Sequence, residues 1–332
     1  MLKRQGKYII AATLLVLIFT QSAIHASIPK ISGPERVEFV VKQGTSLTGI
    51  AHQLAGEGII RLPYLFVGLS LFYKGKLIAG EYDLTRDMGM LEILKKMAHG
   101  ERNIYTLKIV EGNNVYNLAG SIEKSRIMKG EDFLKLTKDG AFLKGLGIEA
   151  DSLEGYLAPD TYYYSKEIDV DKLLEKIAQR TLSFFARKDI RKRMEEMRLT
   201  VHETLILASM IEREAKQRDE KFLISAVFHN RLKKGMSLDC DPTVLYGGAY
   251  DGPIRKSDLL TYTPYNTYAF KGLPKGPICN SDRSSITAAL YPAAVDYLYF
   301  VSKNDGTHAF SRDMKDHNRF VAMYQRNKHT KK

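Results

Sequence analysis

The chain has 332 residues, enough for two modest domains, and its 44% hydrophobic and 27% charged residues are typical of a globular protein. This composition excludes a disordered, collagen-like or polytopic membrane protein, and two cysteines exclude a disulfide-rich scaffold or a Cys-rich metal site. The net charge is +12, but the basic residues alternate with acidic ones and form no arm or stripe, so we expect no nucleic-acid partner.

The N-terminal segment has the pattern of a membrane anchor. Three basic residues within the first seven precede an apolar run that begins at Tyr8 and ends at Ala26, close to the roughly 20 residues needed to cross a bilayer. Positive charge before the run predicts a cytoplasmic N-terminus, with the rest of the chain on the other side of the membrane. We therefore expect a single-pass protein of the cell inner (plasma) membrane, with its main domain periplasmic or extracellular. A signal peptide cleaved after Ala26 is the alternative.

Residues 31–104 are predicted to form a small α/β module after a Pro- and Gly-containing linker at 27–36. The expected elements are a strand at 37–41, helices at 47–56 and 63–73, a strand at 80–84 and a helix at 90–98. The segment VKQGTSLTGIAHQL resembles the start of a LysM-type carbohydrate-binding module. A plain structural subdomain remains the alternative.

Residues 105–332 are predicted to form a larger, mixed domain. We expect strands at 105–110, 297–301 and 308–310, and helices after Asn114 and at 121–127, 130–137, 171–189, 200–214, 218–234, 284–290 and 316–327. Helices mixed with scattered strands favour an α+β fold over a doubly wound parallel sheet. The whole chain is therefore predicted to be α+β, with an anchor, a LysM-like module and a catalytic domain.

The common catalytic motifs are absent from the sequence. It has no Gly-x-Ser-x-Gly elbow, no phosphate-binding loop, no dinucleotide fingerprint and no His-Glu-x-x-His zinc motif. The His202-Glu203 pair lacks a second histidine four positions on, and the eight histidines show no paired spacing. We therefore expect no metal and no other cofactor.

One acidic residue stands in an unusually apolar helix, LILASMIERE. Glu212 shares a helix face with Leu205, Ala208 and Ser209, so its carboxyl is expected to be partly desolvated. Desolvation raises a carboxyl pKa, which is the property that a general acid needs in order to protonate a glycosidic oxygen. The alternative is that Glu212 marks the place where a core helix reaches solvent and pairs with Arg213 or Lys216.

Polar and aromatic residues in several loops are typical of a sugar-binding cleft, where hydroxyls need donors and acceptors and sugar rings need flat apolar partners. The candidate substrate-binding or supporting residues are Glu154, Asn230, Asp241, Thr243, Tyr246, Tyr265, Asn266 and Tyr268. Taken singly, each is more often a turn or cap residue. Glu214 is a further candidate for a polar contact.

Five separated blocks of the sequence resemble the endolytic murein transglycosylases of the MltG (YceG-like) family. They are LEGYLAPDTYYY, ASMIEREA, VFHNRLKKGMSLDCDPTVLYG, TPYNTYAFKGLPKGPICN and LYFVSKNDGTHAFSRDMKDHN. The resemblance runs from about residue 37 to 325 and implies an enzyme that cleaves the MurNAc–GlcNAc β-1,4 bond in nascent peptidoglycan strands. It also implies 1,6-anhydroMurNAc ends, termination of strand elongation and cell-wall synthases as partners. By this resemblance Glu212 is the catalytic acid/base.

The resemblance is incomplete at the aromatic positions. Trp often stands in the family where this chain has Tyr156, Ala158 and Tyr162, and the chain contains no Trp. The residues that would stack on sugars are therefore not carried over from the family.

Two other classes of function remain open: a non-catalytic wall-binding scaffold, and a hydrolase that leaves reducing ends. Cys240 and Cys279 lie in two of the blocks and could either form a disulfide or remain buried thiols.

Overall fold

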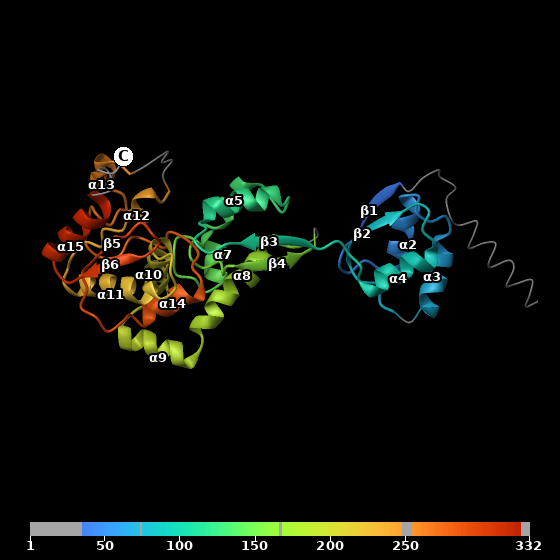
Figure 1. Cartoon of the computed structure of the whole chain (residues 1–332). Coiled ribbons are helices and arrows are strands. Elements are labelled where there is room, and N and C mark those ends of the chain that lie inside the picture. The colour runs from blue at the N-terminus through green and yellow to red at the C-terminus, as the bar shows by residue number, and fades with distance from the viewer. Residues whose placement is uncertain (1–34, 74, 166–167, 248–253, 327–332) are drawn as a thin grey trace, which may run out of the picture. The chain divides into compact units, whose positions relative to one another are not determined.

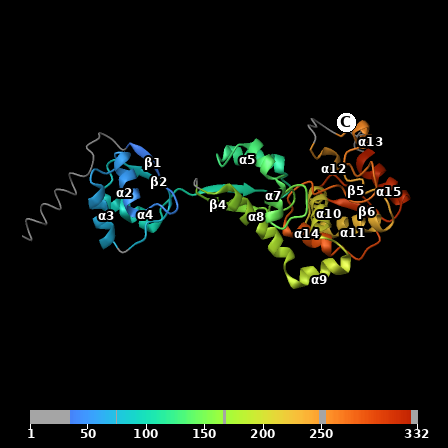
Figure 2. The ribbon, with the colours of Figure 1, turned by 180° about the vertical axis from the view of Figure 1, so that it is seen from behind.

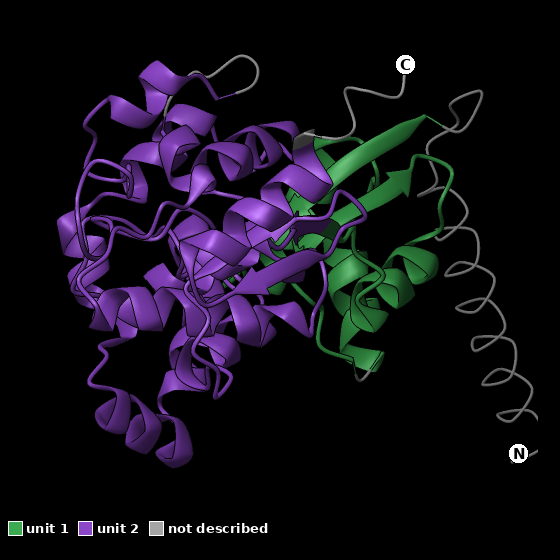
Figure 3. Ribbon diagram, turned by 60° about the vertical axis from the view of Figure 1, so that its left-hand side comes forward, with its two compact units in different colours: residues 1–105, 163–169 green, residues 106–162, 170–332 purple. Residues whose placement is uncertain are grey.

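The computed structural model describes residues 35–326, except 74, 166–167 and 248–253. The predicted anchor and most of the linker lie outside the described residues. Within those ranges, no helix combines the length and apolar character required to cross a bilayer. The chain divides into two compact units, residues up to 105 with 163–169, and residues 106–162 with 170 onward, which Figure 3 colours separately.

Unit 1 contains the five elements that the sequence pattern predicts. They are β1 (Arg36–Val41), α2 (Leu47–Gly56), α3 (Pro63–Phe72), β2 (Gly80–Thr85) and α4 (Met90–His99), shown in blue and cyan in Figure 1. β1 and β2 pair antiparallel, with Phe39 opposite Tyr82. The helices close over this pair, and a core that includes Phe39, Leu54, Tyr82 and Leu94 is almost fully buried.

Unit 2 is mainly helical. Its helices are α5 (Val115–Lys124), α6 (Gly130–Leu136), α7 (Gly140–Gly145), α8 (Val170–Phe185), α9 (Lys188–Met197), α10 (Val201–Glu214), α11 (Glu220–Lys233), α12 (Asp241–Leu245), α13 (Lys256–Leu260), α14 (Arg283–Leu290) and α15 (Met314–Val321), which continues as a π turn to Arg326. The remaining strands are β3 (Tyr105–Ile109), β4 (Asp160–Tyr164), β5 (Tyr299–Ser302) and β6 (His308–Ser311). β3 pairs with β4 and β5 with β6, so the predicted α+β class is confirmed.

Two helix predictions in unit 2 were wrong in their boundaries. The predicted helix 171–189 is two helices, because Arg187 adopts an extended conformation and its guanidinium pairs with Asp189 at the start of α9. The helical pattern at 121–127 is the second half of α5, which a reciprocal cap between Asn114 and Asn117 starts at Val115. β4 and the short helices α7, α12 and α13 were not predicted, since none carries a clear hydrophobic period.

Helix α10 is the centre of unit 2. The Thr200 side chain accepts a hydrogen bond from the Glu203 backbone and the Glu203 carboxylate accepts one from Thr200, which fixes the start of the helix. Most side chains between Thr204 and Ile211 are buried, and α10 packs against α11, α12 and α14 (Figures 1 and 2). This burial places its carboxyl-terminal end, with two glutamates, among loops from the rest of the unit.

Candidate active site

An extended segment before α14 runs along α10 and is bonded to it at both ends. The Ile278 backbone donates to the Ser209 hydroxyl at 3.0 Å, and the Cys279 thiol donates to the Ser209 carbonyl at 3.4 Å. Further along, the Asp282 backbone donates to Glu212 at 3.1 Å. The segment that contains the GPICN block is therefore held on the ASMIEREA helix by hydrogen bonds between main-chain and side-chain groups.

Glu212 lies in an ion-pair network, and its side chain is only 7% exposed. Lys221 of α11 is 3.2 Å from both of its carboxylate oxygens and 3.0 Å from an oxygen of Asp282. The Ser285 hydroxyl donates to Glu212 at 2.7 Å, and that of Ser284 donates to Asp282. The carboxylate of Glu212 therefore already has protein donors on both oxygens.

Opposing effects act on the two acids of this network. Burial raises the pKa of Glu212, while the Ser285 hydroxyl and the Lys221 ammonium oppose that rise. Burial also works to raise the pKa of Asp282. Hydrogen bonds from Ser285, Ser284 and Lys221 outweigh that effect and hold this pKa at about 2. Asp282 is thus ionised at neutral pH and shares the Lys221 ammonium with Glu212.

Glu214 has different surroundings, because residues two apart point to different sides of a helix. The residue as a whole is partly buried, but its carboxyl is strongly desolvated and accepts a hydrogen bond from the buried Cys240 thiol. Burial raises the pKa of Glu214 to about 7, and the nearby Asp241 carboxylate acts in the same direction, against the Cys240 thiol and the Arg213 guanidinium. Glu214 is therefore protonated in a large fraction of molecules at neutral pH.

Two predicted loops are joined beside Glu214. The Tyr268 hydroxyl donates to the Asp241 carboxylate at 2.5 Å, and the Thr243 and Thr267 hydroxyls lie 2.9 Å apart. The Cys240 backbone also donates to Thr267. Asp241 is exposed, whereas Thr243 is fully buried. The structure thus brings Asp241, Thr243 and Tyr268 together near Glu214. The hydrogen bond between the Thr243 and Thr267 hydroxyls holds the two loops together.

Glu154 forms a third acidic cluster, and only 2% of this residue is exposed. One of its oxygens accepts hydrogen bonds from the Val115 backbone and the Tyr246 hydroxyl, both at 2.9 Å, while the Asn280 amide reaches the other at 3.4 Å. Burial raises the pKa of Glu154 to about 7 in spite of those donors. Its donors among the described residues are an amide, a hydroxyl and the backbone N–H groups of Val115 and Gly155, and none of them is a cation.

Glycine is required next to Glu154. Gly155 has a φ of +85°, and a Cβ at this position would lie 2.6 Å from Pro277. This close approach lets the Leu157 backbone donate to the Asn280 side chain at 3.0 Å. The chain around Gly155 therefore lies directly against the GPICN segment, and a hydrogen bond from a backbone N–H to a side chain joins the two blocks.

A tyrosine-lined cavity opens beside Glu154. It has a volume of about 480 Å³, and its walls include Tyr116, Tyr246 and Tyr265. The Tyr246 ring is 4.5 Å from that of Tyr265 and 6.0 Å from that of Tyr116. Rings at different tilts around a polar floor provide the flat apolar faces that sugars pack against.

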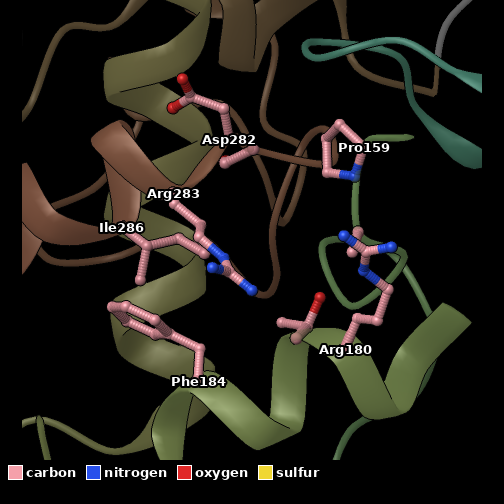
Figure 4. Close-up of a pocket in the computed structure, with 9 residues that line it drawn as sticks. Pro159, Arg180, Phe184, Asp282, Arg283 and Ile286 are labelled. Carbon is pink, nitrogen blue, oxygen red and sulfur yellow. The ribbon is translucent and has the colours of Figure 1, made fainter. Parts of the chain in front are cut away.

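A second cavity, of about 270 Å³, lies on the side of Asp282 and is shown in Figure 4. Arg180 of α8 and Arg283 of α14 extend toward it, and Phe184 and Ile286 provide apolar walls. Arg180 is already paired with Asp160 at 2.6 Å. Asp282 therefore separates this cavity from the buried Glu212–Lys221 pair.

Two of the candidate residues, Asn230 and Asn266, hold backbone carbonyls, and the two cysteines are not bridged. The Asn230 amide donates to the carbonyls of Val295 and Tyr297 and so holds the segment before β5. The Asn266 amide donates to three carbonyls around the end of α13, the closest being Thr261 at 2.6 Å. Cys240 and Cys279 are separate buried thiols, so the alternative of a disulfide is excluded.

Several residues of the site were missed from the sequence. Lys221 could have been found from the sequence, because it stands on the same helix face as Ile224, Ser225 and Phe228, which are all buried. A lysine on a buried face needs an acidic partner. Tyr116, Asn280 and Asp282 carry no such signal, since their neighbours come from distant parts of the chain.

Buried carboxylic acids with raised pKa values, beside amides and tyrosine-lined cavities, define a class of protein that processes sugar chains by general acid–base chemistry. The YceG-like family matches residues 39–323, and the chain belongs to that family.

Named relatives agree with this assignment. The "Endolytic murein transglycosylase" of Bacillus subtilis (strain 168) is 32% identical over 315 residues, which cover 89% of this chain and 86% of that protein. The protein of the same name from Streptococcus pneumoniae (strain ATCC BAA-255 / R6) is 27% identical, and the match covers 87% of this chain but 58% of that longer protein. A crystal structure of a yceG-like protein from Listeria monocytogenes is 32% identical, with a TM-score of 0.60 over 87% of this chain and all of that one.

Proposed function

We propose that this protein is an endolytic murein transglycosylase, which cleaves the β-1,4 bond between MurNAc and GlcNAc within peptidoglycan strands and leaves 1,6-anhydroMurNAc ends. Family membership and the relatives named for this activity support the reaction. The observation that carries the chemistry is a desolvated carboxyl beside Asp241 and Tyr268, that of Glu214, whose pKa burial raises to about 7.

We assign the role of acid and base to Glu214. Protonated Glu214 donates its proton to the glycosidic oxygen as the bond to the MurNAc anomeric carbon breaks and positive charge develops on the sugar ring. The resulting carboxylate then accepts the proton of the C6 hydroxyl, whose oxygen closes the anhydro ring on the anomeric carbon. The proton returns to Glu214, so the enzyme is ready for the next cycle. Because the nucleophile belongs to the substrate, a second carboxylate at hydrolase spacing is not required.

The expectation that Glu212 is the acid stays a prediction, and its surroundings argue against it. A general acid must give its proton to a substrate oxygen, whereas both oxygens of Glu212 contact the Lys221 ammonium. Glu214 is also withdrawn from water, but the donor to its carboxyl is a weakly acidic thiol. We propose that Glu212 positions the 278–282 segment, and that Glu154 with the tyrosine-lined cavity orients a sugar ring.

Glutamine variants test the assignment. Glu214→Gln keeps the side-chain size but has no proton to give, so anhydro ends should fall by about 10²–10⁴-fold in mass spectra of glycan digested with the purified enzyme. Glu195→Gln on α9 is the matched control, since that side chain is exposed and should leave activity unchanged. Loss of product in Glu212→Gln alone would return the role to Glu212. Reducing ends from the wild-type enzyme would indicate a hydrolase, and no product at all would indicate a binding scaffold.

The location and partners are also proposals. The basic residues and apolar run at the N-terminus support a single-pass anchor with unit 2 outside the cytoplasm, where the wall substrate and the synthases that extend it are found. The β1–α2–α3–β2 order with an antiparallel pair supports the LysM-like reading of residues 31–104. Binding of isolated glycan to the full chain, measured with and without substitutions in unit 1, tests that reading.

A further inference from the structure

Helix α3 of unit 1 has no charged residue in its sequence, PYLFVGLSLF. On one side Phe66 is fully buried, and Val67 and Leu69 pack against the core of unit 1. On the other side Tyr64 is 74% exposed, Leu71 72% and Phe72 89%. The helix is thus apolar on its outer face as well as its inner face, which is unusual for a helix in water.

Helix α4 provides an internal comparison. It packs into the same core through Ile93, Leu94 and Met97, and its outer face carries the exposed charges of Glu92 and Lys95. Unit 1 can therefore build an ordinary water-facing helix. The apolar outer face of α3 is a property of that helix and not a consequence of the small size of the unit.

The exposed side chains of α3 form one surface. Tyr64, Leu71 and Phe72 stand at i, i+7 and i+8, which places them on neighbouring stripes of the helix. Gly68 lies between them and has open space where a Cβ would be. Leu62, just before the helix, is 45% exposed, and the Ser70 hydroxyl bonds back to the Val67 carbonyl. We call Leu62, Tyr64, Leu71 and Phe72 the α3 patch.

The position of unit 1 in the chain indicates what covers this patch. Nine residues, 27–35, separate the apolar run from β1, and nine residues reach at most about 30 Å. Exposed basic residues, Arg61 and Lys76, stand on either side of α3 in the sequence. Basic residues close to a bilayer are attracted to anionic head groups, and tyrosine and other aromatic rings favour the head-group level.

We propose that the α3 patch lies on the lipid surface of the membrane and holds unit 1 against it, a proposal that rests on the anchor in the proposed function. The apolar face then enters the boundary between head groups and acyl chains, as an interfacial helix does. Unit 1 is thereby restrained at the membrane surface.

The absence of Trp from the chain makes a direct test possible. Phe72→Trp introduces one indole into the patch, and the full chain is reconstituted into vesicles of mixed neutral and anionic phospholipids with or without brominated acyl chains. An indole held about 5–10 Å into the interface should shift its emission to the blue and lose most of it to the bromines. Tyr262→Trp is the matched control, because Tyr262 is 72% exposed but lies in unit 2, and its emission should not change.

Each outcome decides for or against the proposal. Quenching of the Phe72→Trp variant alone supports it. An unquenched indole overturns it. A blue shift that requires no lipid, or one produced by isolated glycan, overturns it in favour of a second copy of the chain or of a sugar partner. Production of anhydro ends by the same variant is measured in parallel, so failure of the patch can be distinguished from failure of the proposed reaction.

Discussion

The two glutamates at the end of α10 are separated by one residue, yet their environments are opposite. Glu212 faces α11 and α14, where an ammonium, a hydroxyl and a backbone N–H donate to it. Glu214 faces the loop that begins α12, where a thiol and a second carboxylate are its neighbours. Both residues are desolvated, but within the described residues only Glu212 forms an ion pair, with Lys221, whereas the Arg213 guanidinium lowers the pKa of Glu214 without pairing with it. The comparison shows that burial alone does not identify a general acid, because the partner decides what the buried group can do.

The largest expected effect tests the structural side of this comparison. Glu212→Ala leaves Lys221 with Asp282 as its remaining carboxylate, so the free energy of unfolding should fall by about 3–5 kcal/mol in urea denaturation. Lys221→Met should also destabilise the protein. The double variant should lose clearly less than the sum of the single variants, because the two residues interact directly. Strictly additive losses would show that the pair is not coupled.

The next effect concerns Glu154, which resembles Glu214 in having a pKa that burial raises to about 7. Its pKa is about 7 in the folded chain and near 4.5 when unfolded. The folded state therefore keeps its proton to higher pH. The stability this provides is fully present below pH 4.5 and is lost as the pH rises through 7.

Glu154→Gln removes that dependence. The difference in unfolding free energy between variant and wild type should move in favour of the variant by about 3 kcal/mol between pH 4 and pH 8. Glu214 titrates in both proteins and cancels from the difference. A pH-independent difference would mean that folding does not change the pKa of Glu154.

The smallest effect, measured per pH unit, tests the catalytic side of the comparison. If protonated Glu214 is the acid, kcat/KM should fall about tenfold for each pH unit above the Glu214 pKa of about 7. The remaining kcat/KM of the Glu212→Gln variant should still fall above pH 7. The remaining kcat/KM of the Glu214→Gln variant should not show this fall. A fall that disappears only in Glu212→Gln would reverse the assignment.

Local patterns predicted most of the fold. The β1, α2, α3, β2 and α4 segments follow from alternation, caps and glycines within a few residues of each element. The start of α10 follows from Thr200 and Glu203. The break at Arg187 was missed, because the hydrophobic period continues into α9 and only the backbone turn separates the two helices.

The site was predicted less completely. The blocks that contain Glu154, Asp241 and Tyr268 were identified, and the structure places the last two near Glu214. The same reasoning put Asn230 and Asn266 into the cleft, whereas their amides hold backbone carbonyls. An asparagine amide can bond to a substrate hydroxyl or to backbone carbonyls of the protein, and the sequence does not show which carbonyls will lie next to it.

By itself, the sequence determined the α+β class, the resemblance to a wall-cleaving family and the helix that carries the acidic pair. Those properties depend on residue types and on spacings of three or four positions. Only the tertiary structure decided that Glu212, and not Glu214, forms an ion pair with a lysine. Lys221 belongs to another helix, and Asp282, which shares this lysine, lies 70 residues further along the chain than Glu212. Charge interactions weaken with distance, so the protonation state of a buried acid depends on its burial and on the groups that the fold brings closest to it.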